Sequence, residues 1–329
     1  MNVKQIFEQF TQKRILVLGD VMIDAYLQGK VSRVSPEAPV PIVNLTKRDA
    51  RLGGAANVAL NLMSLGAKAV LCGVVGNDRD GERFMDLLVK RNLSKEGIVI
   101  CKDRPTTVKT RILGDNQHLL RIDEEVTSNL SATDEEQVLD KVREIIKSGV
   151  DALIIEDYNK GLLTPRVIEE AIKIAKNAGV IVSVDPKKEN FFAYKEVTLF
   201  KPNLKELKEG LNKEENLRED KNAFENAVNE LIEIINSEIC FVTLSQDGVF
   251  IKNSADHWYI PAHVRNIADV SGAGDTVIAV ATLCLTVGLE PKEVAEIANL
   301  AGGLVCEVSG VIPVDKSRLE QEVQKVVLA

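Results

Sequence analysis

The sequence has few aromatic residues, few histidines and no excess of basic charge. Aromatic residues make up 4% of the 329 residues, so a buried core must be built mainly from Val, Ile, Leu and Ala, as in a sheet that helices cover on both faces. The three histidines are too few and too scattered to form a zinc site. The formal net charge of −8 argues against a nucleic-acid-binding surface, because such surfaces are normally basic.

The sequence also lacks paired cysteines and long apolar runs. The five cysteines are odd in number and include no C-x-x-C pair, which is typical of buried, reduced thiols. The longest apolar stretch, 277–289, is interrupted by threonines and predicts a buried helix rather than a membrane span. The first residues have helical spacing with charges between them, unlike a signal peptide. We therefore expect a cytoplasmic protein with no membrane contact.

Short apolar runs alternate with segments of helical period through most of the chain. They predict buried strands at 14–18, 69–75, 152–155, 180–184 and 239–244, and helices at 55–65, 165–178 and 293–308. This alternation predicts an α/β fold with a mostly parallel sheet and crossover helices. No linker rich in Gly, Ser or Pro interrupts the pattern, so we expect a single domain over residues 1–329.

Two segments break this alternation. Residues 25–52 contain three prolines and short β-like pieces, and residues 106–122 alternate, turn at Gly114-Asp115-Asn116 and resume as a second strand. We expect both segments to stand outside the main sheet as a lid, since lids commonly close over a substrate. Exposed lid edges would be protected by pairing, which favours a homodimer through the lid.

The segment Gly272-Ala273-Gly274-Asp275 precedes an apolar helix that we expect to begin at Thr276. Helix N-termini hold anions through free N–H groups, and glycines let the backbone approach a ligand. A carboxylate there would repel a bare phosphate, so it suggests a base that takes a proton from an attacking hydroxyl. Taken alone, the segment is equally typical of a helix whose N-cap is Asp275.

Two other helix starts carry polar residues. In Gly53-Gly54-Ala55-Ala56-Asn57, the Asn57 amide offers a donor and an acceptor that suit a polyol. Asn203 and Glu206 stand three residues apart, where they could orient Mg²⁺ waters or phosphate oxygens, or simply cap a helix. The turn from Thr243 to Gly248 is, by itself, only a hairpin.

Carboxylates follow several of the predicted strands. Asp24, Asp157 and Asp185 come after successive apolar runs, with Lys160 and Lys187 close behind. Ligands of open α/β sheets bind at the carboxyl ends of the strands, so this edge would suit a sugar that carries a phosphate. Any one of these residues alone is more often a loop charge.

Together these motifs resemble the pfkB, or ribokinase-like, family of carbohydrate kinases. The family signature is matched by Asp269-Val270-Ser271-Gly272-Ala273-Gly274-Asp275. The G-G-x-x-N, N-x-x-E and Thr243–Gly248 motifs precede it along the chain, in the order that the family shows. The resemblance covers essentially the whole chain. It implies a ribokinase-like three-layer fold with a mostly parallel central sheet and a small β-strand lid, and a kinase that uses ATP and Mg²⁺.

Within that family, five segments resemble the kinases that phosphorylate C1 of D-glycero-D-manno-heptose 7-phosphate. The segments are residues 19–24, 32–41, 157–161, 185–187 and 202–206. The implied product is heptose 1,7-bisphosphate, for ADP-heptose and lipopolysaccharide core synthesis. These kinases are often fused to an adenylyltransferase with an H-x-G-H motif. No such motif occurs here, so we expect the kinase alone.

The resemblance also implies roles for individual residues in catalysis and nucleotide binding. Asp275 would be the base, and the N–H groups of Gly272, Ala273 and Gly274 would form the anion hole. Asn203 and Glu206 would organise Mg²⁺ and the triphosphate, with Glu206 holding Mg²⁺ through water. The nucleotide would be bordered by Thr243, Ser245 and Gly248, and Asn299 would lie near the adenine. Many relatives bind a monovalent cation such as K⁺ beside the anion hole, which here would involve Asp269 and Ser271.

For the sugar, the resemblance implies contacts to hydroxyl groups and to the phosphate. The hydroxyl groups would be held by Asp24, Gly53, Gly54, Asn57 and Asp157. Charge and placement make Lys160, Lys187 and Arg121 the candidates for the 7-phosphate.

Other readings of the sequence are a pfkB kinase for another sugar or sugar phosphate and a non-catalytic protein that senses a sugar or nucleotide. The sensing protein is disfavoured because the base, the anion hole and the N-x-x-E motif are all present. A dinucleotide-dependent oxidoreductase is disfavoured because G-x-G-x-x-G is absent after the first strand. The phosphate-binding P-loop motif G-x-x-x-x-G-K-[ST] is also absent from the sequence.

Overall fold

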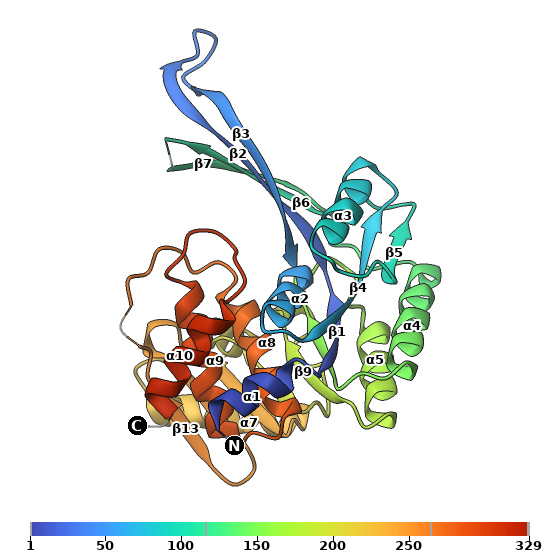
Figure 1. The fold of residues 1–329 in the computed structure, drawn as a ribbon, viewed down its shortest axis with the longest axis vertical. Helices are drawn as coiled ribbons and strands as arrows, with labels where there is room; N and C mark the ends of the chain where they lie inside the picture. Colours follow the sequence, from blue (N-terminus) through green and yellow to red (C-terminus); the bar gives the residue numbers. More distant parts are fainter. Residues whose placement is uncertain (1, 116, 264, 328–329) are drawn as a thin grey trace.

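A large sheet lies between two layers of helices, and a smaller sheet projects from this body (Figure 1). This computed structural model describes residues 2–115, 117–263 and 265–327. The architecture is the expected α/β fold with a mostly parallel central sheet.

The order of strands in the central sheet is β13-β12-β11-β10-β9-β8-β1-β4-β5. Its members are β1 (Arg14–Gly19), β4 (Lys68–Gly76), β5 (Gly97–Cys101), β8 (Ala152–Glu156), β9 (Ile181–Asp185), β10 (Leu199–Phe200), β11 (Ile239–Thr243), β12 (Val249–Lys252) and β13 (His257–Ile260). Neighbours from β11 to β5 pair in parallel, and β12 and β13 pair antiparallel at one edge. All five predicted strands are confirmed.

Helices cover both faces of this sheet and enclose two apolar cores. One core includes residues of α1 (Val3–Phe10), α2 (Ala55–Ser64), α3 (Arg79–Lys90), α8 (Ala273–Thr286), α9 (Pro291–Val305) and α10 (Lys316–Val327). The other includes residues of α4 (Ala132–Lys147), α5 (Pro165–Asn177), α6 (Leu204–Gly210) and α7 (Lys221–Ile235). The three predicted helices are confirmed as α2, α5 and α9.

Helix α8 differs from its prediction in where it begins. It starts at Ala273 rather than Thr276, and Gly272 is its N-cap. The expectation that Asp275 caps the helix is therefore wrong, since Asp275 lies within the first turn. Residues 277–284 of α8 are buried, as expected for a core helix. Within the described residues, no helix is long and apolar enough to cross a membrane. The five cysteines are free and buried, as predicted.

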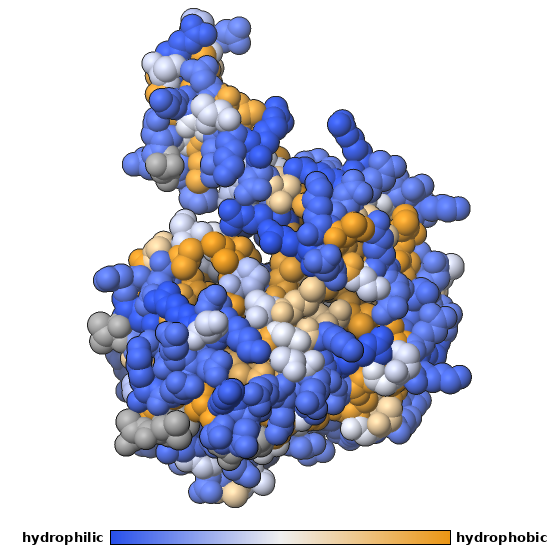
Figure 2. Space-filling model, viewed as in Figure 1, coloured by the Kyte–Doolittle hydropathy of each residue, from blue (hydrophilic) through white to orange (hydrophobic). Residues whose placement is uncertain are grey.

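The smaller sheet, which we call the lid, has the strand order β3-β2-β6-β7. Its strands are β2 (Val21–Val34), β3 (Pro41–Gly54), β6 (Val108–Gly114) and β7 (Gln117–Glu124). They fall on the two predicted lid segments and extend beyond them; of the predicted turn, Asn116 lies outside the described residues. Figure 2 shows the lid rising from the body with a hollow beneath it.

The sheet explains where a site can form. The parallel strands β1, β8 and β9 end beside one another, with Gly19, Glu156 and Asp185 in register. The chain enters the lid directly after β1, so the lid begins at the same edge. Carboxyl ends of parallel strands border the ligand crevice of open α/β sheets, and the crevice here lies between this edge and the lid.

Candidate active site

A buried carboxylate stands where three segments meet. Asp275, in the first turn of α8, accepts one hydrogen bond from the Asn57 amide and one from the Tyr158 hydroxyl, each at 2.7 Å. Asn57 belongs to α2 and Tyr158 to the turn after β8. Burial raises the pKa of Asp275, while the hydrogen bonds from Asn57 and Tyr158 oppose that rise. A raised pKa suits a carboxylate that must accept a proton during a reaction.

The turn before Asp275 presents the N-terminus of α8. Gly272 has a φ of 80°, a left-handed conformation that favours glycine, and a Cβ there would lie 2.9 Å from the Asn57 amide nitrogen. The first backbone N–H groups of α8 have no intrahelical partner and carry the positive end of the helix dipole. The Ala273 N–H donates to Val270 O at a long 3.3 Å. The N-terminal turn of α8 can therefore stabilise negative charge beside a proton acceptor, with Ala273 doing so only if this contact is exchanged.

Asp20 organises the turn that carries Tyr158. Its carboxylate accepts hydrogen bonds from the backbone N–H groups of Tyr158, Lys160 and Leu162 at 3.0–3.2 Å, and its carbonyl accepts from Ala55 N at the start of α2. Burial raises the pKa of Asp20 to about 6 against these hydrogen bonds. Asp20 thus ties the end of β1 to both segments that hold Asp275.

Two further carboxylates and a lysine lie on the same side of the sheet. Asp185 pairs with the buried amine of Lys201 at 2.7 Å, and a Cβ on Gly274 would lie 3.6 Å from Asp185 and 3.8 Å from Lys201. Glu156 is buried with one oxygen, Oε2, that has no hydrogen-bond partner. Burial, with the charges of Asp185 and Asp275, raises the pKa of Glu156 well above its usual value.

The expected Asn203 and Glu206 arrangement is a capping box at the start of α6. Asn203 N donates to Glu206 Oε2 at 2.9 Å, and Glu206 N donates to Asn203 Oδ1 at 2.8 Å. The other oxygen, Glu206 Oε1, binds Lys187 Nζ at 2.5 Å. Burial acts to lower the pKa of Lys187, but the charges of Asp185 and Glu206 outweigh it and raise that pKa. Glu206 can therefore cap α6 through Oε2 and still present Oε1 to the site, where Lys187 binds it.

The residues near Glu206 fit an indirectly held Mg²⁺. Within the described ranges, no group of three or more His, Cys, Asp or Glu side chains is placed to hold a metal directly. Mg²⁺ usually keeps several waters and is bound through one or two carboxylates and substrate phosphates. Glu206, with Asp185 beside the same lysine, offers that donor set. Mg²⁺ bound there would neutralise charge on nucleotide phosphates.

The other predicted nucleotide residues lie around the ends of β11 and β12. Asn203 forms a bridge with Thr243, and Ser245 opens the short 3₁₀ helix Ser245–Asp247 that leads to Gly248. The Asn299 amide donates to Pro261 O at 2.8 Å and so anchors the segment after β13. Asp269 accepts N–H groups of Ser271 and Gly310, each at 3.0 Å. A monovalent cation at Asp269 and Ser271 stays a prediction.

On the lid side, Asp24 is buried in β2 and forms an ion pair with Arg111 of β6. Gly53 lies beside it on β3, where a Cβ would approach Asp24 Oδ2 to 2.3 Å. A side chain at position 53 would therefore displace the Asp24 carboxylate. Gly54 follows as the N-cap of α2. These contacts bring Asp24, Gly53, Gly54 and Asn57 to one continuous stretch of the crevice wall.

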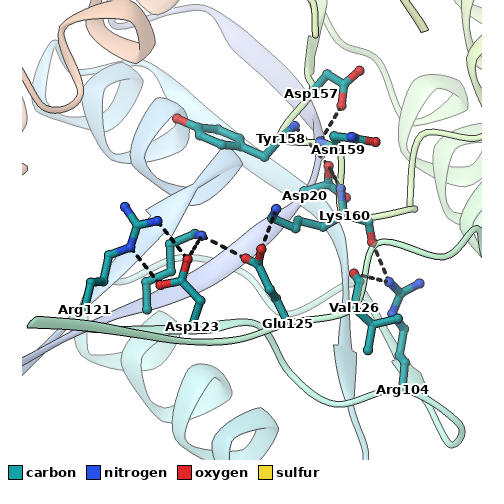
Figure 3. Close-up of polar contacts among 11 residues, drawn as sticks. Asp20, Arg104, Arg121, Asp123, Glu125, Val126, Asp157, Tyr158, Asn159 and Lys160 are labelled. Atoms are coloured by element: carbon teal, nitrogen blue, oxygen red, sulfur yellow. Dashed lines mark hydrogen bonds and ion pairs between the residues drawn. The ribbon is translucent and has the colours of Figure 1, made fainter. Parts of the chain in front are cut away.

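A chain of charged side chains connects the lid to the turn after β8 (Figure 3). Arg121 binds Asp123 through two nitrogens at 2.8 and 2.9 Å, and Lys109 binds both Asp123 and Glu125. Glu125 in turn binds Lys160 at 3.0 Å. Lys160 and Arg121 are thus joined through one network, whereas Lys187 lies with Glu206 and over the Tyr158 ring.

Asp157 does not share this crevice. Its side chain is completely buried and is bonded to the Tyr194 hydroxyl and to Asn159 N, each at 2.7 Å. Figure 3 shows its contact with the backbone of Asn159. The reason is strand alternation: successive side chains of β8 point to opposite faces, so Glu156 takes the place in the crevice that the sequence suggested for Asp157.

The pfkB family carbohydrate kinase profile matches residues 12–317. This chain belongs to the pfkB family of carbohydrate kinases. It is therefore a sugar kinase that transfers a phosphoryl group to a hydroxyl group.

Curated relatives of this pfkB kinase are bifunctional proteins. It is 40% identical over 319 residues to the Bifunctional protein HldE of Desulfatibacillum aliphaticivorans, covering 96% of this chain and 64% of the relative. It is 41% identical over 293 residues to the Bifunctional protein HldE of Helicobacter acinonychis, covering 89% of this chain and 62% of the relative. The chain thus spans less than two thirds of the length of these relatives.

Solved structures of pfkB kinases share the fold. Phosphofructokinase-2 from Escherichia coli, solved in complex with potassium, superposes with a TM-score of 0.78 at 20% identity and covers 96% of this chain and 100% of its own. Arabidopsis thaliana ribokinase, complexed with ribose and ATP, gives a TM-score of 0.70 at 17% identity and covers 94% of this chain and 99% of its own. At these identities the likeness shows the ribokinase-like fold alone.

Sequence reasoning missed several residues of this pfkB kinase site. Glu156 was missed because the apolar run was taken to end at residue 155, one residue too early. Arg111 and Lys109 alternate along β6 and could have been found from the period of two in the predicted hairpin. Tyr158 and Lys201 stood beside predicted residues, but nothing in the sequence showed their partners.

We predict that Tyr158→Phe raises the pKa of Asp275, because it removes a hydrogen bond to the charged carboxylate. A charge-assisted hydrogen bond is worth ~1.5–3 kcal/mol, so the acidic limb of the kcat–pH profile should move up by roughly 1–2 pH units. The control is Tyr194→Phe, which removes the same kind of hydrogen bond from Asp157 and should leave that limb in place. An unmoved limb in Tyr158→Phe would contradict the role of this contact.

Proposed function

We propose that this protein transfers the γ-phosphoryl group of ATP to the C1 hydroxyl of D-glycero-D-manno-heptose 7-phosphate. The product would be heptose 1,7-bisphosphate, for ADP-heptose and lipopolysaccharide core synthesis in the cytoplasm. The observation that carries the kinase chemistry is the buried Asp275 carboxylate beside the N-terminus of α8, held by Asn57 and Tyr158.

In this proposal Asp275 takes the proton of the C1 hydroxyl as its oxygen attacks the γ-phosphorus. The bond from the γ-phosphorus to the β,γ-bridging oxygen of ATP breaks, and ADP leaves. Charge on the transferring group would be stabilised by the N–H groups of Gly272, Ala273 and Gly274. Asn57 and Tyr158 fix the carboxylate, so little movement of the protein is needed at the moment of transfer.

The nucleotide phosphates would lie along Lys187, Lys201 and Glu206. Both lysines carry a raised pKa, because nearby carboxylates outweigh the effect of burial, and so are cations at neutral pH. Mg²⁺ held through water by Glu206 would supply further positive charge on the phosphates. The adenine base of the nucleotide would border Thr243, Ser245, Gly248 and Asn299.

The sugar would lie between the body and the lid. Asp24 and Asn57 offer an acceptor and an amide for sugar hydroxyls, with Arg111 fixing Asp24. For the 7-phosphate we favour Lys160 and Arg121, joined by Lys109 in the charged network. Asp123 and Glu125 form ion pairs with these cations, and a phosphate dianion, which is also an anion with several acceptor oxygens, could replace them.

The choice of heptose 7-phosphate rests on sequence likeness rather than on geometry. Its support is the set of five segments that resemble heptose 7-phosphate kinases and the 40% identity to proteins named HldE. The charged network on the crevice face of the lid supports a phosphorylated sugar over an uncharged one.

A panel of sugars in a coupled ADP-release assay tests this proposal. We expect the highest kcat/KM with heptose 7-phosphate, and a loss of roughly 10²-fold or more with heptose that lacks the phosphate, since hydrogen bonds to charged groups contribute ~1.5–3 kcal/mol each. Fructose 6-phosphate and ribose serve as the comparison, and ³¹P NMR identifies the phosphorylated carbon. Preference for another sugar would refute the substrate, and ligand-induced thermal stabilisation without ADP release would favour a sensing protein.

We also propose that the lid joins two copies of the chain. Several large apolar side chains are exposed on it: Val34, Val40, Leu45, Leu119, Leu120 and Ile122. Figure 2 shows apolar patches along the projecting lid. Apolar patches and open strand edges are commonly covered by a partner, and a structural neighbour, phosphofructokinase-2, has been solved as a tetramer.

Light scattering should therefore give the mass of a dimer for the wild type and of a monomer for Leu120→Asp. The matched control is Val89→Asp on α3, because Val89 and Leu120 are both 57% exposed and only Leu120 lies on the lid. A monomeric wild type, or a Leu120→Asp variant that stays dimeric, would contradict a dimer through this surface.

A further inference from the structure

A basic cavity lies outside the catalytic crevice, between β3 and α3. Its volume is about 510 Å³, and its cationic lining residues are Arg48, Arg51, Arg83, Lys90 and Arg91. Two carboxylates, Asp49 and Asp86, also line it. Arg51 and Asp49 pair with each other, which leaves Arg48, Arg83, Lys90 and Arg91 against the single carboxylate of Asp86. This is a local excess of positive charge on a chain whose net charge is −8. Figure 2 shows hydrophilic side chains gathered at this base of the lid.

The cavity is on the face of β3 that is turned away from the catalytic site. Arg51 contacts the ring of Tyr26, which Arg111 also covers from β6, and a Cβ on Gly310 would lie 2.7 Å from Arg51 Nη1. The Arg51 guanidinium therefore lies on the face of Asp24 and is not one of the cations that face α3. Because side chains of a strand alternate, Arg48, Ala50 and Leu52 point to the other face. That face meets α3, where Arg83 and Leu87 share one side at a spacing of four residues. Arg91, the C-cap of α3, follows four residues later and also lines the cavity.

Most of these cations are not neutralised by the protein. Arg51 pairs with Asp49 at 3.1 Å, and Arg83 has only a 3.6 Å contact to Asp80. For the side chains of Arg48, Lys90 and Arg91, no carboxylate in the described part of the chain lies within ion-pair distance. Clustered cations repel one another, and an anion between them would relieve that repulsion.

We propose that this cavity binds a small metabolite with two phosphate groups, as a diphosphate or a bisphosphate. Three arginines on two facing elements provide planar N–H pairs that match phosphate oxygens, with a lysine beside them. The volume lies within the range of ~300–1,000 Å³ that is usual for small-molecule sites. The net excess of positive charge in the lining matches a ligand with about three negative charges at neutral pH.

An occupant here would bridge the base of the lid to the body. Strand β3 leaves the cavity at Leu52 and continues directly into Gly53 and Gly54, the glycines that lie beside Asp24 and begin α2. The site is therefore separate from the catalytic crevice but attached to the strand that forms one of its walls.

Calorimetric titration of the full chain with inorganic pyrophosphate, at low ionic strength and without divalent metal, tests the proposal. We expect binding to the wild type and a Kd about tenfold weaker or more in Arg48→Gln/Arg91→Gln, because two charge-assisted contacts are lost. The control is Lys47→Gln/Arg79→Gln, which removes the same charge from the same two elements at positions outside the cavity and should bind as the wild type does.

Equal affinity in all three proteins would overturn the proposal, because it would locate pyrophosphate at the catalytic anion hole or at no defined site. Absence of binding to the wild type would overturn it as well. Neither arginine belongs to the proposed catalytic machinery, so kcat at saturating substrates should be unchanged in the double variant. That activity separates failure of this site from failure of the proposed kinase reaction or of folding.

Discussion

The contact on which the rest of the site depends is the pair of hydrogen bonds donated to Asp275. A buried carboxylate without partners costs several kcal/mol, whereas each hydrogen bond to a charged group returns ~1.5–3 kcal/mol. The donors come from α2 and from the turn after β8, so the charge on Asp275 can persist only when these segments are correctly packed. A proton acceptor poised in this way is at the same time a structural junction.

Around Asp275, the body and the lid contribute different kinds of groups to the site. The body supplies fixed groups at the carboxyl edge of a parallel sheet, where Asp20 holds the Tyr158 turn and Asp185 holds Lys201 beside Gly274. The lid supplies groups held mainly by ion pairs with one another, such as Asp24 with Arg111 and Arg121 with Asp123. Rigid packing suits phosphoryl transfer, which needs positioning above all, and exchangeable ion pairs suit a charged sugar.

Much of this could be predicted from the sequence, and the failures have physical causes. Apolar runs report local structure, so the strands and the lid segments were predicted correctly, whereas α8 begins at Ala273, three residues before the predicted start. Asp157 illustrates the limit. Strand β8 ends at Glu156, one residue later than predicted, and successive side chains point to opposite faces. Glu156 therefore faces the crevice, and Asp157 points to the other face, where it bonds to Tyr194. The roles of Tyr158 and Lys201 depend on tertiary contacts between distant segments, which no local pattern encodes.

The measurement that tests the account most directly is the turnover of Asp275→Asn, which keeps the size of the side chain and removes the charge that accepts the proton. We expect kcat to fall by roughly 10²–10⁴-fold, the usual contribution of a general base, with ATP affinity and thermal stability close to those of the wild type. Asp157→Asn is the matched control, since its carboxylate is also buried but accepts a hydrogen bond from Tyr194; this variant should keep its turnover. Near-native turnover in Asp275→Asn would contradict the central role of this carboxylate.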